Sequence, residues 1–156
     1  MNPSHLIDAA NDLLRAKSGR PRQSNLKRAI STAYYAMFHA LCGNSADCLI
    51  GTARADRSKP AWRQVYRSVT HGFAKSQCEN KKIIGLFPEE IQAFATNFVK
   101  LQEKRHEADY DPASKYMLND VELCLETAKL DIARMGEVSI KDRRAFAAWV
   151  TVKDRQ

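Results

Sequence analysis

The segment from Pro88 to Tyr110 constrains the fold most strongly, because its apolar residues repeat with the period of a helix. One face of that helix carries Ile91, Phe94, Phe98 and Leu101. Continuing the same face brings in Arg105, where another apolar residue is expected. An arginine stays charged, so a core-facing position requires an anionic partner or an opening onto a cleft. Asp109, one turn further on, is the nearest candidate partner.

A helix junction follows this segment. Pro112 suits the first turn of a new helix and disfavours helical geometry at Asp111, which we expect to cap that next helix. Charged and aromatic residues therefore gather where one helix ends beside the bundle core. The candidate catalytic residues are Arg105, His106, Asp109 and Tyr110. In the alternative interpretation, Arg105 and Asp109 only close the bundle as an ion pair, and the other two flank it.

Helical patterns recur along the whole chain, and they predict an all-α fold. We expect an antiparallel bundle of about four to five main helices and a short C-terminal helix. The chain length fits a single domain over residues 1–156, with its core in residues 4–136. Two stretches without a sustained period, residues 43–59 and 76–87, are predicted to be irregular connections. The expected helices are residues 4–16 with Ser4 as cap, 24–42, 60–73, 88–110, 112–135 and 139–150.

The helix expected over residues 24–42 carries a polar ridge opposite its apolar stripe. The ridge residues, three and four positions apart, are Arg28, Thr32, Tyr35 and His39. Tyr35 and His39 are candidates for a second wall of the site that contacts a phosphate or a base. The alternative is a packing contact with another helix or a second subunit, the usual role of a lone helical histidine.

The helix expected over residues 60–73 has a basic outer face, continued by a lysine. Its residues lie at four-residue steps and are Arg63, Arg67, His71 and Lys75. Like charges at this spacing repel, so an anionic partner would relieve them, and this basic ladder is the candidate nucleic-acid surface. A formal net charge of +7 favours nucleic acid first and an acidic protein second. The alternative is a solvated basic face.

Composition excludes several classes of function. Four cysteines are scattered without a CxxC pair, and no histidine lies beside them at metal-ligand spacing, so we expect reduced thiols and no metal or other cofactor. The apolar runs are too short to cross a bilayer, and the first residues lack the layout of a signal peptide. The expected location is therefore cytoplasmic, without a membrane partner.

Two motifs resemble those of the HEPN family (higher eukaryotes and prokaryotes nucleotide-binding). AYYAMFHA at residues 33–40 and RHEADY at residues 105–110 are similar to motifs of its small stand-alone prokaryotic members. The similarity spans roughly residues 6–135, in order and spacing. The resemblance implies an antiparallel helical bundle that forms a homodimer, often within a toxin–antitoxin or other defence system.

The resemblance also implies an RNA-directed function. Many members are metal-independent endoribonucleases, in which an arginine is followed after four to six residues by a histidine. Arg105 matches that arginine, but Tyr110 stands where the histidine is expected, so the nuclease motif is incomplete. For cleavage, Arg105 would stabilise the charge on phosphorus, His106 would accept the proton and Asp109 would orient one of them. Tyr110 would be a poor base near neutral pH.

Two alternatives to catalysis remain. One is a non-catalytic HEPN module that binds RNA or a nucleotide through the basic ladder. The other is a protein-interaction module whose basic surface meets an acidic partner, such as the antitoxin of a two-protein system. The resemblance to paired HEPN systems points to a nucleotidyltransferase as that partner, with Tyr110 as the residue it would modify.

Overall fold

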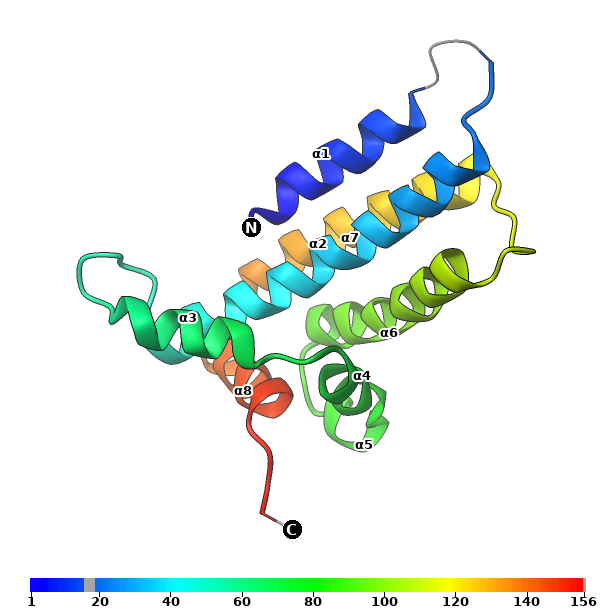
Figure 1. Cartoon of the computed structure of the whole chain (residues 1–156). Coiled ribbons are helices and arrows are strands. Elements are labelled where there is room, and N and C mark those ends of the chain that lie inside the picture. The colour runs from blue at the N-terminus through cyan, green and yellow to red at the C-terminus, as the bar shows by residue number, and fades with distance from the viewer. Residues whose placement is uncertain (16–18, 156) are drawn as a thin grey trace.

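The chain folds into an all-α helical bundle, seen in a computed structural model that describes residues 1–15 and 19–155 (Figure 1). The described residues contain no strand. None of their helices is both long enough and apolar enough to span a membrane. The helices are α1 (Pro3–Leu14), α2 (Gln23–Ile50), α3 (Lys59–Ser68), α4 (His71–Glu79), α5 (Lys81–Ile84), α6 (Glu89–Tyr110), α7 (Leu118–Glu137) and α8 (Ile140–Thr151).

Helix α2 is the centre of the bundle. It runs about 42 Å at the usual helical rise and contacts α1, α3, α6, α7 and α8. In Figure 1 it passes between α1 and α6 with α7 behind it. Small, fully buried side chains on α2 let the neighbouring helices approach closely, and they are Ala29, Ala33, Ala36 and Ala46.

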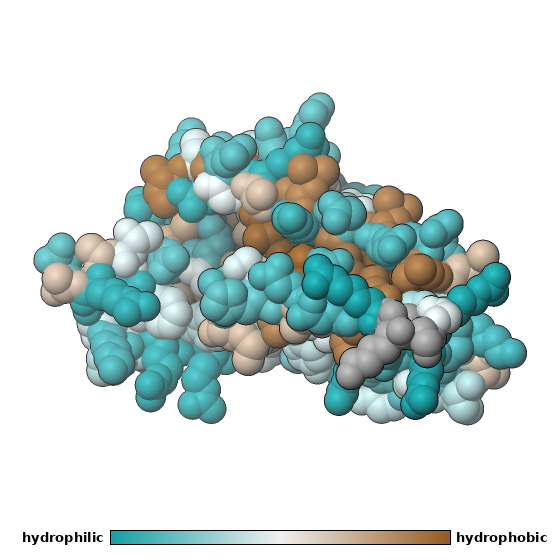
Figure 2. All heavy atoms as spheres, turned by 90° about the horizontal axis from the view of Figure 1, so that it is seen from above, coloured by the Kyte–Doolittle hydropathy of each residue, from teal (hydrophilic) through white to brown (hydrophobic). Residues whose placement is uncertain are grey.

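Aromatic side chains fill the core where α2, α6 and α8 meet. Tyr34, Phe94, Phe98 and Phe146 are completely buried, and the rings of Phe94 and Phe98 stack 6.2 Å apart. Burial of a phenylalanine contributes about 1.5–3 kcal/mol, so these rings anchor the first half of α6 against α2 and α8. Figure 2, viewed from above, shows apolar atoms in a band between hydrophilic side chains.

Helix α2 is longer than the sequence pattern predicted. It continues from the predicted end at Cys42 to Ile50, so the predicted loop over residues 43–59 was wrong for its first half. Ala46 and Cys48 are buried, and Arg144 Nε of α8 donates to the carbonyl of Cys48 at 3.2 Å. Packing against α8 therefore outweighs the weak helix propensity of this stretch. The helix ends at Gly51, whose φ of 126° is available to glycine alone.

The helix predicted over residues 60–73 is two helices. Val69 and Thr70, both β-branched, are extended and separate α3 from α4, and the side chain of Val69 is buried. Helix α3 packs against α2, whereas α4 packs against α6 and α8. The stretch over residues 76–87, predicted to be irregular, contains the second half of α4 and the short α5.

Helix α6 and the C-terminal helix agree closely with prediction, but two predicted caps were wrong. Asp111 does not cap the next helix, which begins only at Leu118. Its Oδ1 instead accepts from the backbone N–H of Ala113 at 2.8 Å and forms a turn. Asn2, rather than Ser4, caps α1 by accepting from the N–H of Ser4 at 3.0 Å. The predicted end of that helix at residue 16 lies outside the described residues.

Candidate functional site

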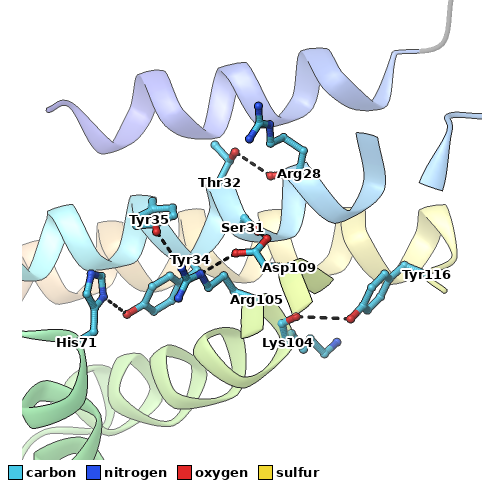
Figure 3. Close-up of polar contacts among 10 residues, drawn as sticks. All are labelled: Arg28, Ser31, Thr32, Tyr34, Tyr35, His71, Lys104, Arg105, Asp109 and Tyr116. Carbon is cyan, nitrogen blue, oxygen red and sulfur yellow. Dashed lines mark hydrogen bonds and ion pairs between the residues drawn. The ribbon is translucent and has the colours of Figure 1, made fainter. Parts of the chain in front are cut away.

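Arg105 lies on the core-facing side of α6, as predicted, and its charge is paired. Its Nε lies 2.9 Å from Asp109 Oδ2, which confirms the predicted partner (Figure 3). The N–H does not point at that oxygen, so the contact is an ion pair rather than a hydrogen bond. Nη2 donates to the hydroxyl of Tyr35 at 3.1 Å, and the guanidinium carbon lies 5.4 Å from the centre of that ring. The side chain is 20% exposed.

Asp109 joins the end of α6 to α2. One carboxylate oxygen faces Arg105, and the other accepts from Ser31 Oγ at 2.5 Å. Ser31 is itself buried. The sequence interpretation missed Ser31, although it lies one turn before Tyr35 on the same side of α2 and could have been found from that spacing.

A histidine from α4 lies beside this ion pair, and it is His71. Its Nδ1 lies 2.6 Å from the hydroxyl oxygen of Tyr34, and its ring stacks on Phe38 with 3.9 Å between ring centres. Burial, and then the charge of Arg105, lower the pKa of His71 below its usual value. Burial raises the pKa of the Tyr34 phenol. At neutral pH the structure therefore holds a neutral imidazole against a protonated phenol, a pair that the sequence interpretation missed.

The two residues proposed as a second polar wall have different partners. Tyr35 contacts Arg105, whereas His39 Nδ1 lies 2.6 Å from the hydroxyl oxygen of Tyr66 on α3. Burial lowers the pKa of His39. Further along α2, Asp47 Oδ1 accepts a hydrogen bond from Trp62 Nε1 of α3 at 2.8 Å. Tyr35 thus belongs to the Arg105 cluster, and His39 belongs to the contact between α2 and α3.

The four predicted catalytic residues divide into two pairs. Arg105 and Asp109 face α2, while His106 and Tyr110 are exposed, with 4.8 Å between their ring centres. A rotation of about 100° between neighbouring helical residues accounts for the separation of His106 from Arg105. His106 instead lines an open hollow of about 460 Å³ with Lys75 and Glu103. This arrangement does not place the predicted base beside the predicted arginine.

The predicted basic ladder is divided by the break between α3 and α4. Arg63 and Arg67 are exposed on α3, where they line an open hollow of about 420 Å³ with Lys59, Pro60 and Gln64. Within residues 1–15 and 19–155, Lys59, Arg63 and Arg67 form no ion pair. His71 turns inward to Tyr34.

Lys75, the last residue of the predicted ladder, lies on α4 and not on α3 with Arg63 and Arg67. On α4 its Nζ lies 3.5 Å from Glu79 and 3.3 Å from Glu103, so its charge is already matched. The exposed half of the predicted ladder is therefore Arg63 and Arg67. Together with Lys59, which is also exposed and was not part of the ladder, they form what we define as the basic α3 face.

The part of the chain that the structure describes shows no metal site. Among the described residues, no three His, Cys, Asp or Glu side chains are grouped as metal ligands. The cysteines there are free and buried, and burial raises the pKa of Cys42 and Cys78 to about 12. The Cys42 and Cys78 thiols therefore stay protonated and unreactive at neutral pH.

Comparison of the chain with models of protein families, with curated proteins and with solved structures finds no match. A function for this chain is therefore inferred from the geometry of the Arg105 cluster, from the basic α3 face and from the two sequence motifs.

Proposed function

We propose that this chain is an HEPN-like protein that binds RNA through the basic α3 face. The observation that supports the proposal is the exposure of Lys59, Arg63 and Arg67 on one side of a helix, without an ion pair among the described residues. RNA, rather than another polyanion, follows from the resemblance of the two sequence motifs.

The spacing of these cations suits a phosphate backbone. Residues four apart in a helix are separated by about 6 Å along its axis, so successive cations can each meet a different phosphate. Their mutual repulsion costs a few tenths of a kcal/mol per pair, and a bound polyanion removes it. Each neutralised phosphate also releases counterions, which makes the affinity strongly dependent on salt.

The aromatic residues of α3 face away from the basic surface. Trp62 and Tyr66 stack on each other with 5.1 Å between ring centres, and their polar atoms bond to Asp47 and His39 of α2. The basic α3 face accordingly offers cations but no exposed ring on which a base can stack. We therefore expect binding to the backbone with little preference for sequence.

A charge-reversal experiment tests this function. Fluorescence anisotropy with a labelled single-stranded RNA is measured between about 50 and 200 mM salt. Arg63→Glu with Arg67→Glu should weaken binding at least tenfold and lower the salt slope by about 1.4, which is two contacts at about 0.7 each. The control is Lys81→Glu with Lys82→Glu, which reverses two exposed charges on α5. Equal losses in both variants would contradict a specific role for α3.

A second candidate function is metal-independent cleavage of RNA by Arg105 and His71. The observation that favours it is the contact of both residues with Tyr34. The Arg105 guanidinium carbon lies 5.8 Å from the ring centre, and His71 contacts its hydroxyl. A neutral imidazole beside a guanidinium can accept a proton while the cation stabilises charge on the phosphate.

Cleavage of total RNA in EDTA tests this candidate. Arg105→Ala and His71→Asn should each abolish cutting, whereas His106→Ala should leave it unchanged. Circular dichroism checks that each variant is folded. Loss of cutting in His106→Ala alone would restore the assignment made from the sequence and exclude His71 as the base.

A further inference from the structure

A hollow larger than the one on α3 lies where α4, α8 and the C-terminal segment, residues 152–155, meet. It measures about 850 Å³, and aromatic side chains from separate segments line it, namely Phe73 of α4, Phe87 between α5 and α6, and Trp149 of α8. Each of these rings is half-buried, so each keeps part of its surface open. Binding sites for small molecules and cofactors measure about 300–1,000 Å³. The hollow is therefore large enough to admit a planar ring among aromatic walls.

The ring of Trp149 is held in place by hydrogen bonds between α8 and α4. Its Nε1 donates to the carbonyl of Gln77 at 3.0 Å, and Gln77 Nε2 donates to the carbonyl of Trp149 at 2.9 Å. Within the described residues the side-chain oxygen of Gln77 has no hydrogen-bond partner, and it is not sealed from solvent. A ring that is already fixed loses little freedom when a ligand stacks on it. The free oxygen can accept an N–H from the edge of a planar heterocycle.

The rim of the hollow is positively charged. Lys153 and Arg155 of the C-terminal segment are exposed and line the hollow, and Asp154 supplies one opposing charge. Nζ of Lys153 lies 5.2 Å from the centre of the Phe73 ring. Neither cation forms an ion pair among the described residues. An anionic group attached to a ring in the hollow would therefore meet cations at the rim.

We propose that this hollow holds an unstacked base of the RNA strand whose backbone lies on the basic α3 face, an inference that rests on the proposed function. The aromatic rings stack on the base, and Lys153 and Arg155 contact the neighbouring phosphates. A paired base must first be unstacked from its duplex, at a cost in free energy, so the hollow selects single-stranded RNA. Because every base has a face on which to stack, the preference for sequence stays low.

The hollow and the α3 face are close enough to share one strand. Arg67 on α3 and Phe73 on α4 are six residues apart, and the chain passes between them through Val69 and Thr70 (Figure 1). Their Cα atoms are therefore at most about 22 Å apart. Sites for single strands commonly cover about 4–16 nucleotides, and a strand of that length reaches from the cations of α3 into the hollow. The hollow thus supplies the aromatic surface that the α3 face lacks.

Strands with and without bases test the proposal on the full chain. Fluorescence anisotropy compares a labelled single-stranded RNA with a stable abasic strand of equal length and with a duplex. The wild type should bind the single strand at least fivefold more tightly than the abasic strand, since stacking of one base corresponds to roughly fivefold to a hundredfold. Phe73→Ala should remove this difference and leave the affinity for the duplex unchanged, whereas Phe73→Trp should retain it. Circular dichroism checks that the variants are folded.

The cations at the rim provide a second measurement with a matched control. Lys153→Glu should lower the salt slope for the single strand by about 0.7, the value for one phosphate contact. Lys141→Glu, at an exposed lysine in the first turn of the same α8, should leave the slope unchanged. Ultraviolet crosslinking of thiouridine-substituted RNA, read by mass spectrometry, should attach the base to Phe73, Phe87 or Trp149.

The outcomes distinguish the hollow from the α3 face. Equal affinity for the single and abasic strands, no effect of Phe73→Ala and Lys153→Glu, or crosslinks only outside the hollow would overturn the proposal, while a loss in Arg63→Glu with Arg67→Glu would still support the α3 face. Wild-type affinity in that double variant, together with crosslinks in the hollow, would overturn the role of α3 instead. A wild type that binds no RNA would overturn both.

Discussion

Replacing Asp109 by alanine tests whether the Arg105 ion pair stabilises the fold. The change leaves a guanidinium that is only 20% exposed without its anion, and Ser31 without its acceptor. Breaking a fully buried pair costs about 3–5 kcal/mol. Since the Asp109 side chain is 31% exposed, solvent screening reduces this, and we expect a loss of about 1–3 kcal/mol in the free energy of unfolding.

Urea unfolding followed by circular dichroism measures that loss, and a double-mutant cycle with Arg105→Met separates the pair from its parts. The loss corresponds to a fall in Tm of roughly 2–4 °C per kcal/mol for a chain of this size. The double variant should be no less stable than Asp109→Ala alone, because removing the guanidinium also removes the unpaired charge. A loss below about 0.5 kcal/mol together with additive single effects would refute the structural role of the pair.

Two further predictions concern pH and the helix α2. Burial lowers the pKa of His71 and His39 below the usual 6.5, so the unfolded chain binds more protons, and the free energy of unfolding should fall as the pH drops below about 6.5. Urea titrations between about pH 5 and 8 should show a smaller fall for His71→Gln with His39→Gln, and an unchanged slope would contradict the prediction. Gly43→Ala should stabilise the chain by about 0.5–1 kcal/mol, since the site is mid-helix and open. Gly51→Ala should destabilise it by about 1–3 kcal/mol at its φ of 126°, and thermal unfolding that shows the same sign for both would contradict this pair.

The parts of the fold that were predicted correctly depend on local pattern. Helix α6 begins and ends as expected because its apolar spacing is regular and its flanks carry Pro88 and Pro112. The length of α2 and the break at Val69 could not be read in the same way. Both are decided by packing between distant segments, namely α2 against α8 and α4 against α6 and α8.

The contacts of the candidate site also fall into those set by local spacing and those set by packing between helices. Arg105 and Asp109 are four residues apart on one helix, so their pairing followed from spacing. The contacts of Ser31 with Asp109 and of Tyr34 with His71 join different helices, and a single sequence does not specify them. The ladder from Arg63 to Lys75 assumed a continuous helix, so it was divided when α3 ended.

The polar residues on α2 that bond to other helices make structural contacts, and these contacts are distinct from the exposed binding surface. Ser31, Tyr35, His39 and Asp47 lie at multiples of four residues on a ridge that winds partway round α2, and they bond in order to α6, α6, α3 and α3. This row of matched polar contacts fixes how α6 and α3 sit against α2, because sliding either helix would leave buried or half-buried polar groups unpaired. The side chains available to a ligand are therefore those outside this row, and the basic α3 face is held in place by it. Asp47→Ala should therefore loosen the packing of α3 on α2 and weaken RNA binding, although it removes none of the exposed cations. Fluorescence anisotropy of this variant, compared with that of the Arg63→Glu with Arg67→Glu variant, measures the loss.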